Sequence, residues 1–152
     1  MRPWEGRRRK GRAVEIERLM NSIKIGNATI DGEHRALFEC LQEINAHLCD
    51  KKGEKTFAAC KRLMKMLEAH FESEEEILHT AGFPRLDRHI GMHHEIRESL
   101  RQAFTACRQA CRNNQPTKCL PDLTFILVDH FLRGDMDYKS HLQMVNMANE
   151  NG

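Results

Sequence analysis

The chain has 152 residues, which is enough for one domain with a substantial core and too few for two domains of ordinary size. Charged residues make up 30% of the chain, yet the net charge is only +2, so a general attraction to nucleic acid or membranes is not indicated. No apolar run approaches the roughly 18 residues of a membrane-spanning helix, and the N-terminus lacks the hydrophobic segment of a signal peptide. We therefore expect no membrane span and a cytoplasmic location.

The N-terminal segment concentrates the positive charge. MRPWEGRRRKGR places six Arg and Lys residues within the first twelve positions. No aromatic interleaving or amphipathic repeat accompanies this charge, so a solvated arm is favoured over a contact with nucleic acid or lipid. We therefore expect residues 1–20 to form a basic, disordered arm without a nucleic acid partner, and residues 21–150 to form one helical domain.

Helical periodicity recurs four times along the rest of the chain, and strand signals are nearly absent. The four predicted helices span about 31–48, 57–79, 86–112 and 118–133, and a short fifth helix begins at about 136. Asp31 is a good N-cap for the first helix, and Gly82 and Pro84 make a turn between the second and third. Short connections between helices of similar length predict an all-α, up-down-up-down four-helix bundle with a short C-terminal helix.

The fourth predicted helix ends in HFLRGD, residues 130–135. Positions five apart are about 140° out of register on an α-helix, so His130 and Asp135 cannot share a face of a continuous one. Gly134 is a suitable residue for ending the helix. We therefore expect the helix to stop at Gly134, so that Asp135 can turn back beneath His130.

Polar residues interrupt the inward, apolar stripes of the four helices, and in an up-down bundle these interruptions fall at one end. They are His34, His70, Glu74, His89, His93 and His130. Burying imidazoles and carboxylates is costly unless something neutralises them, and a metal centre is the simplest neutraliser. Taken singly, each histidine is equally consistent with a hydrogen-bonded core residue, and His70 with Glu74 is equally consistent with a helix-surface pair. The sequence, however, supplies few hydrogen-bond partners nearby.

With Asp135 the cluster contains five histidines and two carboxylates, which are too many for one ion and suit two. Nitrogen-rich ligation with two carboxylates that can both bridge favours a pair of irons over magnesium or calcium. Zinc remains possible from the ligand types, although the HExxH motif of zinc proteases is absent because Ile90 follows His89. The chain shows no Ser-His-Asp set and no Gly-rich phosphate loop.

The four motifs that carry these residues resemble the pattern of the hemerythrins, especially the single-domain bacterial ones. They are DGEH at 31–34, HFESE at 70–74, HIGMH at 89–93 and HFLRGD at 130–135. The resemblance covers about residues 21–141, and both the types and the order of all seven ligand residues match. It implies a hemerythrin-like bundle that holds two iron ions.

The resemblance also assigns a role to each ligand. One iron would be held by His89, His93 and His130. The other iron, which keeps a vacant position for dioxygen, would be held by His34 and His70. Glu74 and Asp135 would bridge the two irons, alongside an oxo or hydroxo group.

The resemblance further implies an apolar oxygen pocket, formed by Leu37, Phe71, Ile126 and Leu127. The same four residues are also expected in an ordinary core, and the two roles are compatible. Family members often have a tryptophan where this chain has Ile126, so we expect a wider pocket here.

Six cysteines in a chain without a secretory signal are expected to be reduced. Helix topology predicts that five of them gather at the end of the bundle away from the histidines: Cys49, Cys60, Cys107, Cys111 and Cys119. Small buried core residues are the favoured interpretation, and a redox-active or metal-binding thiol group is the alternative.

The resemblance implies a protein that is not an enzyme and that binds dioxygen reversibly for transport, storage or sensing. One alternative is a di-iron enzyme acting on peroxide, nitric oxide or oxygen. Ferritin-like oxidases usually carry two Glu-x-x-His motifs, and only Glu76 to His79 fits that pattern here. A second alternative is an oxygen-responsive signalling module, which requires a protein partner.

Overall fold

The computed structural model describes residues 17–49, 53–113 and 120–151. Within these ranges all regular structure is helical, which confirms the predicted all-α class. The long helices are α2 (Ala28–Cys49), α3 (Gly53–Thr80) and α4 (Leu86–Arg112), and they are followed by α5 (Leu120–Asp129). None of the described helices combines the length and the hydropathy needed to cross a membrane.

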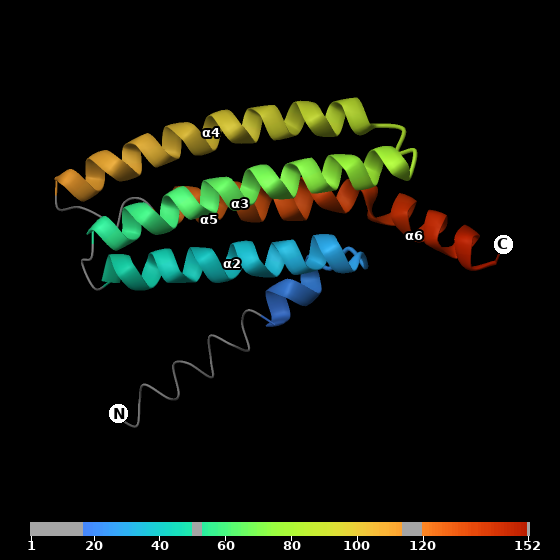
Figure 1. Ribbon diagram of the computed structural model, residues 1–152, viewed down its shortest axis with the longest axis horizontal. Coiled ribbons are helices and arrows are strands. Elements are labelled where there is room, and N and C mark those ends of the chain that lie inside the picture. Colours follow the sequence, from blue (N-terminus) through green and yellow to red (C-terminus); the bar gives the residue numbers. More distant parts are fainter. Residues whose placement is uncertain (1–16, 50–52, 114–119, 152) are drawn as a thin grey trace, which may run out of the picture.

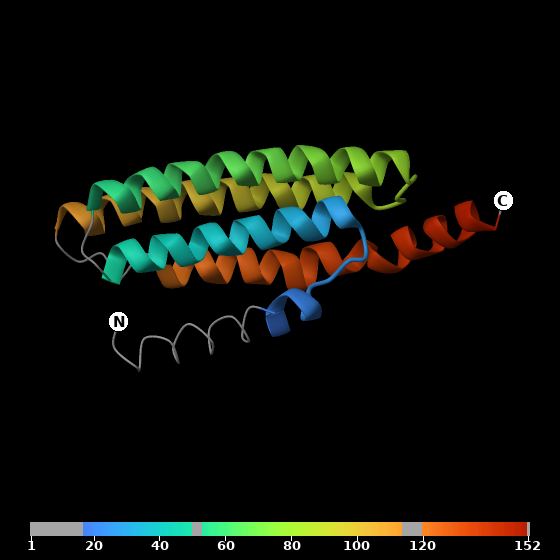
Figure 2. The same ribbon diagram turned by 60° about the horizontal axis from the view of Figure 1, so that its bottom comes forward.

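The four helices run alternately up and down, as Figures 1 and 2 show, and this confirms the predicted bundle. The start of α2, the end of α3, the start of α4 and the end of α5 therefore lie at one end, where α6 (Met136–Glu150) continues outward. We call this end the histidine end and the opposite one the cysteine end.

The first helix of the bundle begins at Ala28, so the prediction that Asp31 is its N-cap is wrong. The side chain of Asn27 fills that role, because its Oδ1 accepts the backbone amides of Thr29 and Ile30, each at 3.1 Å. The carboxylate of Asp31 instead accepts the backbone amides of Ile25 and Gly26, at 2.8 and 3.0 Å. Asp31 thus fastens the preceding segment to the helix.

The turn between α3 and α4 is the predicted one at Gly82. Gly82 has φ +64°, a conformation that glycine adopts without a steric penalty. The amide of Gly82 donates to the carbonyl of His79 and the amide of Phe83 to that of Leu78, each at 3.0 Å, which is the Schellman arrangement. Phe83 and Leu78 also pack in one apolar cluster, so the turn closes over a hydrophobic contact.

The fourth helix does not stop at Gly134, contrary to our expectation. Residues 130–135 instead form a single widened turn, η2 (His130–Asp135), in the π-helical form with i to i+5 hydrogen bonding, and α6 follows without a break. Gly134 is needed here for space. A Cβ at this position would lie 2.7 Å from Cε of Met92 and 2.9 Å from Nδ1 of His130.

Two apolar clusters fill the molecule. The main core runs along the bundle and includes the buried side chains of Leu37, Leu63 and Phe131, and the smaller one, around Ile30 and Tyr138, lies beneath α6. Residues 17–22 are helical, and the side chain of Met20 is buried in the main core. Residues 1–16, which carry the basic stretch, lie outside the described residues, so the arm and the domain boundary stay predictions.

The cysteine end agrees in part with our expectations. Cys60 and Cys107 line one small cavity there, as predicted, and both are buried. Cys40 is a buried free thiol, but Cys107 is disulfide-bonded, so the expectation of fully reduced cysteines is wrong. The side chains of the remaining three, Cys49, Cys111 and Cys119, lie outside what the structure describes.

Candidate metal centre

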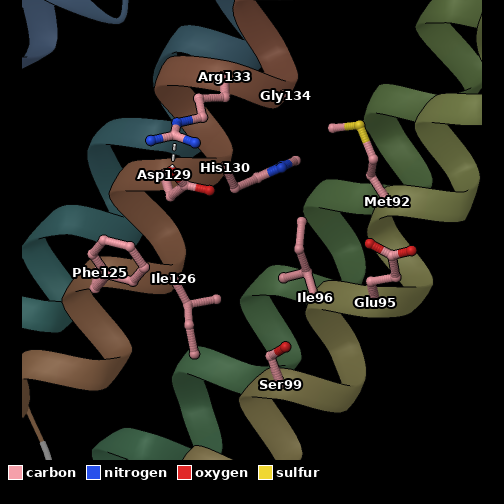
Figure 3. A pocket seen from close by; sticks show the side chains of 10 residues that line it. All are labelled: Met92, Glu95, Ile96, Ser99, Phe125, Ile126, Asp129, His130, Arg133 and Gly134. Carbon is pink, nitrogen blue, oxygen red and sulfur yellow. Dashed lines mark ion pairs between the residues drawn. The ribbon is translucent and has the colours of Figure 1, made fainter.

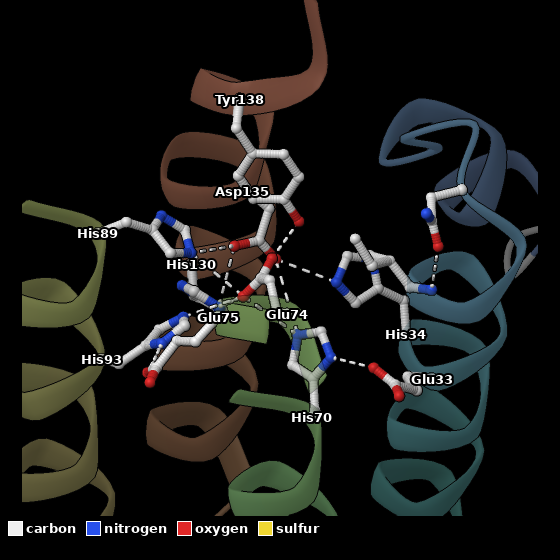
Figure 4. A network of polar contacts seen from close by, with 12 residues as sticks. Glu33, His34, His70, Glu74, Glu75, His89, His93, His130, Asp135 and Tyr138 are labelled. Atoms are coloured by element: carbon white, nitrogen blue, oxygen red, sulfur yellow. Dashed lines mark hydrogen bonds and ion pairs between the residues drawn. The ribbon is translucent and has the colours of Figure 1, made fainter. Parts of the chain in front are cut away.

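The structure brings all seven predicted ligand residues together at the histidine end (Figure 4). They are His34, His70, Glu74, His89, His93, His130 and Asp135, and none is more than 3% exposed. Each long helix supplies at least one of them, because each helix has a polar position on its inward face at this height. The assembly is therefore a property of the bundle rather than of any one motif.

The widened turn η2 places His130 and Asp135 on one face. A π-helical turn contains more residues than an α-helical turn, so positions five apart come close to alignment instead of diverging by about 140°. Nε2 of His130 accordingly lies 3.1 Å from Oδ1 of Asp135. The insertion of one residue into the turn thus achieves what we had expected a helix stop to do.

The side chains form two overlapping groups in which one ligand atom from each residue lies within 4.8 Å of the others. The first group is His34, His70, Glu74 and Asp135, and the second is Glu74, His89, His93 and Asp135. Nε2 of His130 adds a third imidazole to the second group, 3.1 Å from Asp135 and 4.0 Å from Glu74. Glu74 and Asp135 are therefore shared, and the two halves differ, with two imidazoles in one and three in the other.

Several buried polar atoms of this cluster have no hydrogen-bond partner, which is the sign expected of a metal site. They include Nε2 of His34, His70, His93 and His130 and both oxygens of Asp135. Nε2 of His34 lies 3.0 Å from Oδ2 of Asp135, but the pair lacks hydrogen-bond geometry. Leaving such atoms unpaired in a protein interior is costly, and cations placed among them would satisfy them together. The donor set therefore fits a pair of transition-metal ions.

The charges of the cluster perturb one another strongly. Burial raises the pKa of Asp135 well above its ordinary value, and the nearby carboxylate of Glu74 raises it further. Burial also opposes ionisation of Glu74, but the close imidazoles of His89 and His93 outweigh it and hold the pKa of Glu74 well below the usual range. Burial lowers the pKa of His130 well below its ordinary value. The imidazole of His130 is thus kept in the neutral form that binds metals.

Three residues that the sequence reasoning missed support the cluster from outside. Nδ1 of His70 donates to Oε2 of Glu33 at 2.8 Å, and Nδ1 of His93 donates to Oε1 of Glu75 at 2.7 Å. Tyr138 donates a short hydrogen bond from its hydroxyl to Oε1 of Glu74. A proton held on Nδ1 leaves the lone pair of Nε2 directed into the centre, which is how carboxylates orient metal-binding histidines.

These three residues left only weak signals in the sequence. Glu33 and Glu75 directly adjoin the predicted ligands His34 and Glu74, but each bonds to a histidine of a neighbouring helix. Spacing along one helix does not show which side of the next helix it faces. Tyr138 is the only tyrosine of the chain and is completely buried, three residues beyond Asp135.

Apolar side chains surround the cluster on the side of the main core. Leu37, Phe71 and Leu127 are at most 1% exposed, whereas Ile126 is half-buried and lines a cavity beside His130. The ring of Phe71 stacks on that of His93 at 4.1 Å, and the ring of Phe131 lies 4.2 Å from that of His34. Such surroundings keep water from the polar atoms within.

The other histidines stand apart from the centre. His79 and His94 are exposed, and His47 lies 3.3 Å from Glu43 on the surface of α2. Nε2 of His141 bonds to the carbonyl of Ala81 at 2.8 Å, where it helps to hold α6 against the α3–α4 turn. These four histidines therefore do not belong to the buried cluster.

Fold and site together define a helical-bundle protein with a buried, histidine-rich cluster that could hold metal ions. Residues 25–142 match the model of one protein family, described as the hemerythrin HHE cation binding domain. The chain therefore belongs to the hemerythrin family, as the motifs had indicated.

Two curated relatives are similar to parts of the chain. A myohemerythrin of Theromyzon tessulatum is 30% identical over 73 residues, which are 47% of this chain and 55% of the relative. A bacteriohemerythrin of Campylobacter jejuni subsp. jejuni serotype O:23/36 (strain 81-176) is 28% identical over 75 residues, which are 49% of this chain and 56% of the relative. The chain thus spans about half the length of the curated relatives it matches.

Proposed function

We propose that this protein holds two iron ions at the histidine end and binds dioxygen reversibly there. The observation that carries the proposal is the set of buried, unpartnered nitrogen and oxygen atoms that converge from four helices. His89, His93 and His130 would hold one iron, and His34 and His70 the other. Glu74 and Asp135, which belong to both groups, would bridge the pair.

The unequal halves support an open position on one side of this centre. Three imidazoles face the shared carboxylates on the half with His130, and two on the half with His34. Two ferrous ions held there would supply the electrons that dioxygen binding requires, and the surrounding side chains would supply none. The half with His34 and His70 therefore has room for an external ligand.

The protein's own residues would hold the centre rigid and dry. Glu33 and Glu75 keep His70 and His93 in the tautomer that presents Nε2, and Tyr138 fixes one oxygen of Glu74. Leu37, Phe71, Ile126 and Leu127 would form the apolar lining of the ligand position. Excluding water and protons from this position favours release of dioxygen over its reduction.

The proposal assigns no catalytic turnover to the centre. Both buried carboxylates would bridge the two irons, which leaves neither as a general base for a substrate. Membership of the hemerythrin family, whose proteins are generally oxygen carriers or sensors, supports oxygen binding rather than an enzymatic role. A cytoplasmic location and a protein partner for oxygen delivery or signalling remain predictions.

The visible spectrum of the reduced, iron-loaded protein tests the proposal. Iron content should approach two per chain, and a charge-transfer band should appear with oxygen and vanish when oxygen is removed. Irreversible oxidation with turnover of peroxide or nitric oxide would instead favour an enzyme. Iron content far below two per chain would overturn both.

A further inference from the structure

The buried cluster needs a path to solvent, and two cavities each reach one of its histidines. One lies between α4 and the fourth helix, has a volume of about 380 Å³, and is lined by His130. The other lies between residues 20–24 and the first turns of α2, has a volume of about 210 Å³, and is lined by His34. We call them the His130 cavity and the His34 cavity. They approach opposite halves of the cluster.

The His130 cavity, shown in Figure 3, ends against a crowded part of the site. Cε of Met92 and Nδ1 of His130 both crowd the position that a Cβ on Gly134 would take. Its charged lining residues are Glu95, Asp129 and Arg133, and Arg133 is paired with Asp129 at 2.8 Å. The carboxylate of Glu95 remains, so the lining is negative. The half of the cluster it reaches is also the one that already has three imidazoles.

The His34 cavity has the opposite character. The carboxylate of Asp31 is engaged by the amides of Ile25 and Gly26, and Arg35 is paired with Glu17 at 2.8 Å. The charges of Asp31 and Arg35 are therefore engaged. Among the described residues lining this cavity, the positive charge of Lys24 remains. His34, at the inner end, is 1% exposed, and neither of its ring nitrogens has a hydrogen-bond partner.

We propose that the His34 cavity is the entrance through which small ligands, and small anions in particular, reach the metal centre. It meets the half with two imidazoles, where the proposed function leaves an open position, and to that extent the proposal rests on the proposed function. An imidazole bound to a metal through Nε2 carries a proton on Nδ1, so His34 would present a hydrogen-bond donor. Lys24 at the mouth adds a positive charge, and both features favour a small anion.

Gly32 is a suitable position for closing this cavity. It lines the cavity and is exposed, and a Cβ built on it meets no atom within 4 Å. Gly32→Phe therefore adds a ring at the mouth, and its Cβ meets no neighbouring atom. Gly91 on α4 is likewise exposed and free of atoms within 4 Å, and it does not line the His34 cavity, so Gly91→Phe is the matched control.

The first experiment uses the metal-free full chain and does not depend on the proposed function. Diethyl pyrocarbonate modifies accessible imidazoles, and mass spectrometry follows each histidine separately. We expect measurable modification of His34 in the natural chain. Gly32→Phe should slow it about tenfold, the effect of an added barrier of about 1.4 kcal/mol. Modification of the exposed His79 and His94 should be unchanged, as should that of His34 in Gly91→Phe.

The second experiment follows azide binding to the oxidised, iron-loaded protein by stopped-flow spectroscopy. Gly32→Phe should again slow association about tenfold. Ser99→Phe, which narrows the His130 cavity from an exposed position, should leave the rate unchanged. Lys24→Gln should slow association at low ionic strength only, because salt screens an exposed charge.

Each outcome decides the proposal. His34 that resists the reagent in the natural chain, or reacts equally in Gly32→Phe, would overturn it. So would azide binding that Ser99→Phe slows and Gly32→Phe does not, since the entrance would then be the His130 cavity. If the protein fails to hold iron, the proposed function fails, while the labelling of His34 still tests the entrance.

Discussion

The histidine end and the cysteine end of the same bundle differ in the kinds of side chain that they bury. At the cysteine end, Cys60 and Cys107 pack with Phe104 around a cavity of only about 10 Å³. At the histidine end, five imidazoles and two carboxylates occupy equally buried positions. Among the described residues, every buried side-chain nitrogen or oxygen without a hydrogen-bond partner belongs to this cluster.

The difference shows where the fold depends on something outside the polypeptide. Close packing of apolar side chains and the disulfide bond of Cys107 stabilise the cysteine end. The histidine end carries desolvated polar groups whose cost would be offset by cations bound among them. The cysteine end therefore contributes to the stability of the bundle, and the histidine end provides the candidate site for cations.

Asp135→Ala should produce the largest change, and only at the histidine end. The substitution removes a carboxylate that both halves share, so we expect iron content to fall from about two per chain to well below one. The bundle should stay helical, because its core lies elsewhere. Elemental analysis and far-ultraviolet circular dichroism measure the two effects.

Asp137→Ala is the matched control for this variant. Asp137 lies two residues away on α6, is 41% exposed and pairs with Arg85 on the surface. It should retain full iron content. Full retention of iron in Asp135→Ala would show that this carboxylate is not a ligand.

Metal loading should stabilise the two ends unequally. A ligand at about a thousand times its dissociation constant adds about 4 kcal/mol to the free energy of unfolding. For a chain of this size we expect the melting temperature to rise by about 8–16 °C. Hydrogen exchange should slow most in amides near His34, Glu74 and Asp135. Equal protection at both ends would contradict a local site.

Leu63→Ala should lower the stability of the bundle and leave the metal content unchanged. Leu63 is 1% exposed on α3, one turn from Cys60, and its truncation leaves a cavity in the main core. We expect a loss of about 2–5 kcal/mol in the free energy of unfolding, measured by urea denaturation. Iron content per folded chain should not change. Loss of iron together with stability would mean that the two ends do not act independently.

Much of the fold and of the histidine cluster could be predicted from the sequence, because both depend on helical periodicity. Inward positions recur every three or four residues, so His89 and His93, or His70 and Glu74, identify themselves as face-sharing pairs. The turn at Gly82 could likewise be predicted from the sequence. Antiparallel topology then brings the pairs to one height. The five residues of these groups that periodicity predicts are His34, His70, Glu74, His89 and His93, and the structure brings them together with Asp135 and His130.

The sequence misled us where local geometry departs from the regular helix. Residues 130–135 form a π-helical turn, and reasoning at 100° per residue predicted a stop at Gly134 instead. Asn27 and Asp31 are both acceptable N-caps, and only tertiary contacts show that Asp31 instead bonds to the preceding segment. The partners of Glu33 and Glu75 lie across helix interfaces, where spacing along one helix carries no information.

Glu75→Ala should produce the smallest of these effects, because Glu75 acts on the site only through His93. Losing the carboxylate that holds the Nδ1 proton should weaken metal binding by about 10–100-fold, measured by competition with a chelator. Glu75→Gln keeps an acceptor oxygen but loses the charge, so an intermediate affinity is expected. The exposed neighbour Glu76 provides the control, and Glu76→Ala should bind metal normally.

If Glu75→Gln matches Glu75→Ala in metal affinity, the charge orients His93. If it matches the natural chain, the hydrogen bond alone is sufficient. Normal binding in all three variants would mean that packing against Phe71 already fixes the ring.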